Sequence, residues 1–409
     1  MSYYILPKNF NKVVISPDIT HDDNIIHISF SLYKYYNDIK KQIIKICLSQ
    51  SPDCSMNTFD KIIRIINPYE FIFNKVPSSL FSVSKLKPNT NIFYDFFEIS
   101  NTLNIFDHFK NMNINSLNIG INNIDSINCT EILREEYDDK FYDFKEINND
   151  LYTSIANINF DFIFCELENN YDHVNLYIIN FIKIILIILK NQNNNGICII
   201  KVDKLFHKPV TDILYLLSSL YEKMYIIKPN TTNITTYEKY IVCKKFICSE
   251  NKIELYKNNY NTLRNFLIEH NYDIKNKKIN VKSLIQENIP LFFTNKIDDI
   301  NIIIGQQQID SLNQIVNILK NKNRDEKIES IKKINIQKSV LWCEKFKIPC
   351  NKFSERTNIF LPLNNKKEEF EEELEEELEE ELEQEDLEEE DLEEELEQGL
   401  EQGLEVQVE

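Results

Sequence analysis

The chain has 409 residues, of which 43% are hydrophobic, so it can bury at least one large core. Its net charge of −19 is unevenly distributed: residues 368–409 contain 25 acidic and no basic residues, which leaves 40 acidic against 46 basic residues, about +6, in residues 1–367. A mildly basic body is compatible with a polyanionic partner, but a solvated lysine-rich surface explains the same composition.

Cysteine usage and the N-terminus indicate a reducing compartment. The nine cysteines have no repeated spacing, and Cys165, Cys198 and Cys243 lie in apolar segments, as reduced core residues do. Cys343 and Cys350 lack the paired spacing and nearby histidine of a zinc site, so we expect no metal. The first ten residues contain no apolar core of a signal peptide. We therefore expect a cytoplasmic protein. The abundance of Asn, Ile and Lys is typical of AT-rich coding, as in some large DNA viruses, for which the location would be the host cytoplasm or the virion.

The first 65 residues are predicted to be an addition to the main domain. They combine a strand-like segment at residues 25–33 with a helical pattern at residues 36–48. This addition either covers the core or contacts substrate. Further along, residues 116–122 predict a strand and residues 135–144 a polar loop.

A strand, a helix and a second strand are predicted between residues 160 and 202. The runs at 160–165 and 197–202 are short, apolar and rich in aromatic or branched residues, as buried strands are. The apolar stretch between them is too long for a strand and contains polar residues that argue against a membrane span. This pattern predicts two parallel strands joined by a crossover helix. Glu166 and Lys201 then lie at the strand ends, where open α/β sheets bind ligands. Charged residues are also common at strand ends that are simply exposed to solvent.

The C-terminal part is predicted to contain a mainly helical extension at residues 249–365 and an acidic tail at residues 366–409. Amphipathic patterns at residues 256–270 and 310–322 support the helices. Trp342 and residues 361–363 are candidates for packing back on the core. The tail repeats EEEL-like units, and its uncompensated charge favours a disordered, solvated segment over an arm that docks on a basic protein.

The segment that follows GICIIKV at residues 196–202 carries a family resemblance. It has the spacing K-P-x₈-E-x-Y-x-V-C, which is filled by Lys228, Pro229, Glu238, Tyr240, Val242 and Cys243. This ordered set resembles the C-terminal half of the FtsJ-type RNA ribose 2'-O-methyltransferases, a family that includes cap methyltransferases. The resemblance covers residues 159–246 and is weaker from 66 to 158. It implies an α/β fold, a Rossmann-like doubly wound methyltransferase sheet at residues 66–248.

The resemblance also implies a catalytic set of two lysines and two acids. Lys201 would accept the proton of a ribose 2'-OH, and Glu238 and Glu166 would flank it, with Glu166 standing where the family has Asp. The first lysine of the family set precedes the cofactor loop; Lys85 is our assignment, and Lys75 is the alternative. Burial and the Lys85 ammonium are expected to lower the pKa of Lys201, whereas the two acids would raise it.

S-adenosylmethionine is the implied cofactor. In the family its loop is rich in glycine, because only glycine lets the backbone approach a ligand so closely. Residues 91–109 take the place of the first strand and this loop but contain neither Gly nor Pro. Residues 116–122 would be the second strand, whose end reaches the cofactor ribose. The implied cofactor contacts are Glu98, Ser100, Asn101, Asn122 and Asp143.

Three functions are consistent with these features. The leading one is methyl transfer from S-adenosylmethionine to a ribose 2'-OH of RNA, such as the cap-proximal nucleotide of mRNA. The second is a catalytically inactive, methyltransferase-like RNA-binding or scaffold subunit, suggested by the missing glycines and the Asp-to-Glu exchange. The third is a methyltransferase with another acceptor, such as a base or a protein. The expected partners are RNA and, for the tail, a basic protein; no membrane is expected.

Overall fold

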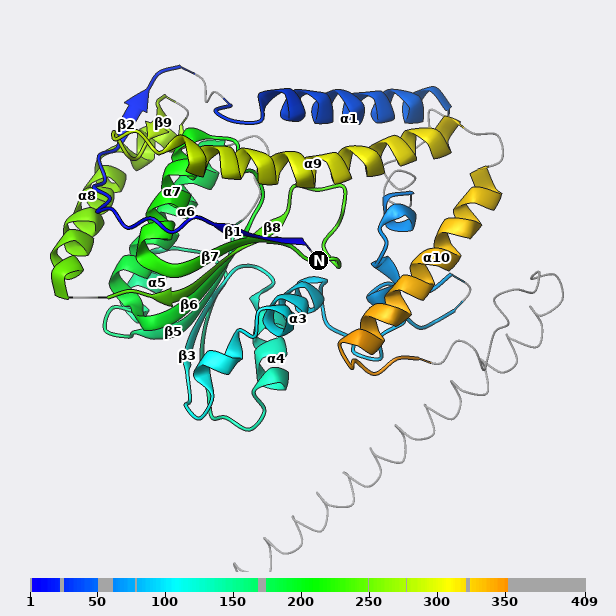
Figure 1. Cartoon of the computed structure of the whole chain (residues 1–409), viewed down its shortest axis with the longest axis horizontal. Coiled ribbons are helices and arrows are strands. Elements are labelled where there is room, and N and C mark those ends of the chain that lie inside the picture. Colours follow the sequence, from blue (N-terminus) through cyan, green and yellow to red (C-terminus); the bar gives the residue numbers. More distant parts are fainter. Residues whose placement is uncertain are drawn as a thin grey trace, which may run out of the picture. The chain divides into compact units, whose positions relative to one another are not determined.

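A seven-stranded mixed sheet forms the centre of the protein (Figure 1). The computed structural model describes residues 2–351 except 23–25, 51–61, 78, 168–173, 249, 277 and 321–323. The strands of the sheet are, in spatial order, β1 (Ser2–Leu6), β7 (Tyr221–Lys228), β8 (Lys239–Phe246), β6 (Gln192–Val202), β5 (Phe160–Glu166), β3 (Asn115–Ile119) and β4 (Lys140–Phe144). The strands β4, β3, β5 and β6 are parallel, whereas β8 is antiparallel to both of its neighbours and β1 is antiparallel to β7.

Helices cover both faces of this sheet. On one face, α6 (Val174–Asn191) and α7 (Lys208–Leu220) share a hydrophobic core with the strands, and α8 (Glu250–Lys275) packs against α6. On the other face, Phe96 of α3 (Ile92–Thr102) contacts the rings of Phe162 and Phe164 on β5. The helix α4 (Asn123–Leu133) packs beside α3 and over β3, β4 and β5. The Rossmann-like α/β architecture predicted from the sequence is confirmed.

The predicted strand–helix–strand unit is also confirmed. The strands β5 and β6 are parallel and α6 connects them. Although α6 is long and apolar enough to cross a membrane, 67% of it is buried within the protein. We therefore assign it as the core helix of the crossover.

Three predicted local structures are wrong. The described residues of the segment 25–33 do not form a strand. Ile26 forms only an isolated bridge with His207, and α1 (Phe30–Gln50) begins four residues later. Residues 91–109 are not a strand and loop; they form α3 and the 3-10 helix η2 (Phe106–Phe109). Residues 135–144 end in strand β4 rather than forming a loop throughout. The first and third segments are too short to show a clear period. The second was assigned from its place in the family resemblance, and its nearly continuous apolar run does not separate strand from helix.

The helical extension after the sheet is confirmed. The helix α9 (Leu291–Lys320) lies beside α1 in Figure 1, and their buried side chains form a second hydrophobic cluster that includes Phe206 and Tyr237. The helix α10 (Arg324–Lys345) brings Trp342 against Tyr94 of α3, so this tryptophan does pack back on the core. The smaller elements are β2 (Asp18–Thr20), which pairs with β9 (Asn280–Ser283), η1 (Glu70–Ile72) and α5 (Asn149–Ser154). Residues 361–363 and the acidic tail lie outside the described residues.

A buried ion pair closes the connection between α4 and β4. Arg134 Nε lies 2.5 Å from Asp139 Oδ2, and each side chain is only 2% exposed. The guanidinium also donates hydrogen bonds to the carbonyl oxygens of Phe109 and Met112, at 3.3 and 2.7 Å. Because a buried charge is tolerated only when it is paired and hydrogen-bonded, this arrangement fixes the turn that precedes β4.

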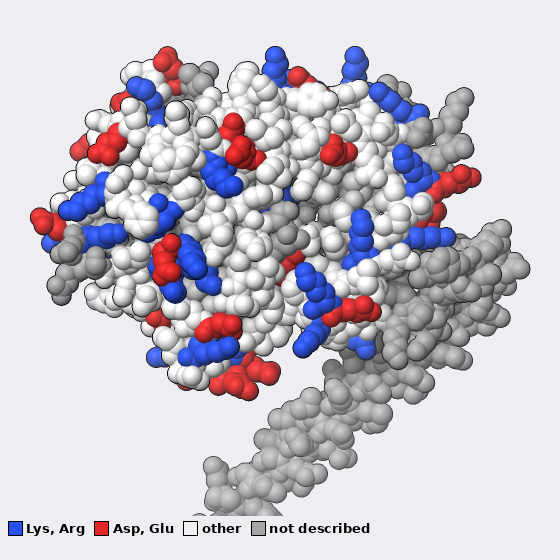
Figure 2. Space-filling model, in the orientation of Figure 1, with Lys and Arg blue, Asp and Glu red and all other residues white. Residues whose placement is uncertain are grey.

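The surface shows no single concentration of positive charge on the face drawn in Figure 2. Lysine and arginine side chains are spread over it, with acidic side chains between them. The small positive charge of residues 1–367 is thus not gathered into one patch on this face.

Candidate active site

Three charged side chains meet at the C-terminal edge of the central strands. The register of β5 and β6 places Glu166 opposite Lys201, and that of β6 and β8 places Lys201 opposite Tyr240. Because side chains alternate between the faces of a strand, residues paired in this way lie on the same face. Lys201 Nζ is 2.9 Å from Glu166 Oε1 and 3.5 Å from Glu238 Oε1. The structure therefore brings together three of the four residues assigned to the catalytic set.

This cluster is open to solvent on the side of Glu238. The side chain of Glu238 is 35% exposed, whereas those of Lys201 and Glu166 are 14% and 10% exposed. A ligand that arrives from solvent meets Glu238 first, and Lys201 and Glu166 form the floor of the site.

The pKa of Lys201 determines what its amine can do. Burial lowers this pKa, but the carboxylates of Glu238 and Glu166, with a further contribution from Asp95, outweigh burial and raise it to about 12. Lys201 is therefore an ammonium at neutral pH. It is a hydrogen-bond donor and a fixed positive charge, not the free amine that a general base requires.

Asp95 is a site residue that the sequence reasoning missed. It lies on the sheet-facing side of α3, where it accepts hydrogen bonds from the hydroxyl of Thr231 and, at 3.0 Å, from that of Tyr240. Burial raises its pKa to about 6 despite these bonds. The available signal was an acid inside the apolar run IFYDFFEI, because an ionisable residue on a buried helix face needs a specific partner.

Three of the assigned cofactor contacts lie on α3 rather than on a loop at a strand end. Glu98 is buried and accepts hydrogen bonds from the backbone N–H of Asn230 at 2.9 Å and from Trp342 Nε1 at 3.2 Å; burial raises its pKa to about 7. Ser100 is buried in the same helix, and the exposed Asn101 donates to the carbonyl of Phe97. The assignment of a cofactor loop to this segment was wrong because the segment is helical.

The turn between β3 and α4 takes the place of that loop. The strand β3 is the first parallel strand in chain order, and it is followed directly by Gly120, which has φ +149°. The Asn122 backbone N–H and side-chain amide donate to Glu166 at 3.3 Å, so Asn122 lies beside the charged cluster. Asp143, on the neighbouring strand β4, accepts a hydrogen bond from the amide of Asn123. Asn122 and Asp143 are thus both at this edge of the sheet.

The charge of the site suits a cationic cofactor. The carboxyl groups of Glu166, Glu238 and Asp95 lie near the ammonium of Lys201, and Glu238 and Asp95 also lie near that of Lys228. When ionised, the three acids carry one more charge than the two lysines, and a sulfonium or ammonium group would reduce this excess. The residues present fit S-adenosylmethionine in this respect, and Asn122, Glu166 and Asp143 are those that would hold it.

The lysine assigned as the first of the catalytic set lies apart from this cluster. Lys85 is exposed, and its backbone N–H donates to the carbonyl of Pro349 at 2.9 Å. Within the described part of the chain, its ammonium has no ion pair with Glu166 or Glu238, and it is not among the groups that shift the pKa of Lys201. The alternative, Lys75, is also exposed.

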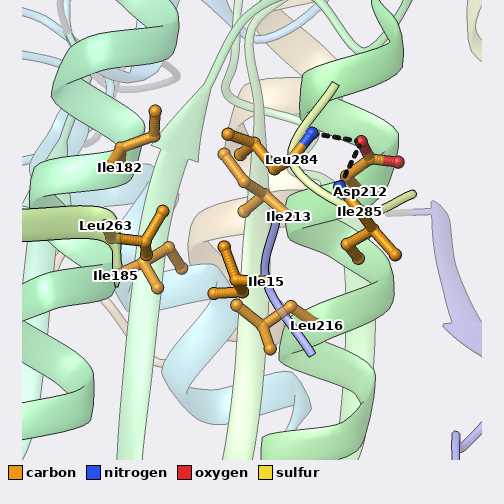
Figure 3. Close-up of a pocket in the computed structure, with 9 residues that line it drawn as sticks. All are labelled: Ile15, Ile182, Ile185, Asp212, Ile213, Leu216, Leu263, Leu284 and Ile285. Carbon is orange, nitrogen blue, oxygen red and sulfur yellow. Dashed lines mark hydrogen bonds between the residues drawn. The ribbon is translucent and has the colours of Figure 1, made fainter. Parts of the chain in front are cut away.

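A small apolar cavity lies elsewhere in the core (Figure 3). It holds about 10 Å³, room for about one water molecule, and its walls are isoleucine and leucine side chains from α6, α7 and α8 and the segments around residues 15 and 284. Asp212 lies at its margin, where its carboxylate accepts the backbone N–H groups of Leu284 and Ile285 at 2.8 and 3.3 Å. The cavity is a packing gap and not a substrate site.

The part of the chain that holds the site is similar to a known methyltransferase family. Residues 89–246 match the model of the FtsJ-like methyltransferase family. The match begins after Lys85 and includes Asp95, Glu166, Lys201 and Glu238. No curated protein matches the chain.

Proposed function

Since residues 89–246 match the FtsJ-like methyltransferase family, we propose that the protein transfers the methyl group of S-adenosylmethionine to a ribose 2'-OH of RNA. The observation that supports this proposal is the Lys201 ammonium held between Glu166 and Glu238 at the ligand-binding edge of the sheet. The cap-proximal nucleotide of mRNA is the first substrate that we propose to test.

The residues of the site supply position and charge for this reaction. A ribose hydroxyl is a weak nucleophile, so a base must take its proton as the new bond to oxygen forms. Lys201, with a pKa of about 12, donates a hydrogen bond to that oxygen and stabilises its negative charge. Glu238 is the carboxylate on the solvent side and accepts the proton, while Glu166 holds Lys201 in place. When bound, S-adenosylmethionine supplies the electrophilic methyl group.

Methyl transfer to defined RNAs tests this function. The assay measures labelled methyl groups incorporated from S-adenosylmethionine into capped and uncapped RNA. We expect Lys201→Ala to lower kcat on the order of 100-fold or more, and Lys223→Ala, at an exposed position of β7, to leave it unchanged. Undiminished activity of Lys201→Ala would remove Lys201 from the mechanism. Incorporation into a base or a protein, with none into ribose, would establish a different acceptor.

A second candidate function is a catalytically inactive, RNA-binding or scaffold subunit. The observation that favours it is the contact between Glu166 and the β3–α4 turn, because a Cβ atom at Gly120 would lie 2.6 Å from Glu166 Cβ. The space beside the only glycine of the turn is therefore taken by a side chain of the protein. Calorimetry with S-adenosylmethionine separates the two candidates, since only the enzyme needs to bind the cofactor.

We also propose RNA as the partner of residues 1–367 and a basic protein as the partner of the acidic tail. The charge division between the two parts of the chain supports both proposals. The proposed location is the cytoplasm, or the host cytoplasm and virion for a viral protein. Fractionation of expressing cells tests the location directly.

A further inference from the structure

Lys228 closes the loop that carries Glu238. It is the last residue of β7 and is buried, with its ammonium inside the loop between β7 and β8. Lys228 Nζ donates to the carbonyl oxygens of Asn233 at 3.0 Å, Thr236 at 2.8 Å and Glu238 at 3.0 Å. An ammonium has three N–H donors, so each is matched to one carbonyl of the same loop.

These bonds determine where the Glu238 carboxylate lies. One of them fixes the backbone of Glu238 itself, and another fixes Thr236. The Thr236 hydroxyl lies 3.2 Å from Glu238 Oε2 and 3.0 Å from the carbonyl oxygen of Asn233, and its one proton is donated to either acceptor. The carboxylate is then 3.5 Å from Lys201 Nζ. A shift of about 1 Å in a group that acts on substrate can cost on the order of 100-fold in rate, so the precision of this loop matters for the site.

We infer that Lys228 is a positioning residue for the reaction: its three-carbonyl clamp holds Glu238 against Lys201, and loss of one Lys228 proton opens the clamp. A neutral amine has only two N–H donors and turns a lone pair toward the third carbonyl. The catalytic part of this inference rests on the proposed function, whereas the clamp itself does not.

The surroundings of Lys228 put this proton loss within reach of mild alkaline pH. Burial lowers the pKa of Lys228 to about 8, although Glu238, Asp95 and Asp203 oppose the effect. Lys239 on β8 is a second buried lysine nearby, and burial lowers its pKa to about 7, so it is mostly neutral above pH 8. Because the pKa of Lys201 is about 12, Lys201 keeps its charge while the clamp opens.

The pH dependence of folding stability separates a positioning role of Lys228 from a purely structural one. The pKa of Lys228 is lower in the folded protein than its ordinary value of 10.5, so between pH 8 and 10.5 the unfolded chain binds more protons. This group therefore makes the folded state more stable as pH rises through that window. Opening of the clamp is not accompanied by a Lys228-dependent loss of stability.

The first test uses the wild-type protein, labelled with ¹³C at the backbone carbonyls of Asn233, Thr236 and Glu238. We expect their NMR shifts to titrate together with a midpoint near pH 8, while the protein stays folded. Shifts that do not change between pH 7 and 9.5, or that change only on global unfolding, would overturn the inference.

The second test compares Lys228→Met with Lys223→Met, a lysine on the same strand that is exposed. Removal of a like charge alone would raise the pKa of Lys201, whereas release of Glu238 lowers it. We therefore expect Lys228→Met and Glu238→Gln each to lower the pKa of Lys201, measured by NMR titration, and the double variant to add nothing further. An unchanged or raised pKa in folded Lys228→Met refutes the clamp.

Methyl transfer adds a third readout. We expect Lys228→Met to lower kcat on the order of 10- to 100-fold with KM for RNA nearly unchanged, and wild-type kcat to fall above pH 8. A wild-type protein without methyltransferase activity would refute the proposed function and leave the clamp to be judged by the two titrations. If Lys228→Met does not fold, the carbonyl titration of the wild type decides.

Discussion

Replacement of Lys201 by methionine should destabilise the protein by an amount that depends on pH. In the folded protein, the neighbouring acids outweigh burial and raise the pKa of Lys201 from 10.5 to about 12. This rise corresponds to about 2 kcal/mol, at about 1.4 kcal/mol for each pKa unit. Because the folded-state pKa is the higher one, this stability is fully present below pH 10.5 and is lost as pH rises through about 12.

The carboxylates that remain in Lys201→Met add to its loss of unfolding free energy. Without the ammonium, Glu166 and Glu238 lose their cation, and the largely buried Glu166 keeps only its bonds to Asn122. We therefore expect Lys201→Met to lose about 2 kcal/mol or more of unfolding free energy at pH 7.

Urea-induced unfolding at pH 7, followed by the fluorescence of the single tryptophan Trp342, measures this difference. Lys223→Met is the control, because Lys223 is exposed. Equal stability of Lys201→Met and wild type at pH 7 would show that the ion cluster does not stabilise the fold.

Three further variants test other parts of the structure. Asp139→Ala leaves Arg134 as an unpaired buried charge and should cost about 3–5 kcal/mol in urea unfolding; a loss below about 1 kcal/mol would mean that the pair is solvated. Gly120→Ala should displace Glu166, because the new Cβ atom would lie 2.6 Å from Glu166 Cβ. We expect weaker binding of S-adenosylmethionine by this variant in calorimetry. An affinity equal to that of the wild type would contradict the placement of the cofactor at this turn. Asp95→Asn should stabilise the protein at pH 7 by about 2–3 kcal/mol but not at pH 4. The pKa of Asp95 is raised to about 6 in the folded protein, so the ionisation of Asp95 lowers the stability of the wild type as pH rises from 4 to 7. A variant less stable than wild type at pH 7 would show that its ionised hydrogen bonds outweigh its burial.

The strands that carry the site were predictable because each is a short apolar run that ends in a charge. Once β5 and β6 are parallel neighbours, their ends meet at one edge, and the meeting of Glu166 and Lys201 follows. These two positions needed only local pattern and the rule for parallel crossovers. Glu238, by contrast, was assigned from its place in the family motif that runs from Lys228 to Cys243.

The rest of the site depends on contacts that local pattern does not encode. The run IFYDFFEI is apolar on almost every side, so its period does not separate strand from helix, and its assignment as a strand moved Glu98 to the wrong place. Asp95 reaches the site only because α3 packs across the strand ends and meets Thr231 and Tyr240, residues more than 130 positions away. Lys85 lies apart from Glu166 and Glu238 for the same reason. The backbone around Lys85 forms hydrogen bonds with residues 349–351, which are distant in the sequence.

The position of β1 has a consequence for how the chain is assembled. Ser2 pairs with Lys228 and Leu6 with Met224, so β1 and its partner strand are more than 200 positions apart in the sequence. Contacts between such distant segments form slowly. Deletion of the first six residues would expose the backbone of β7 as a new sheet edge, a surface on which another extended chain can assemble.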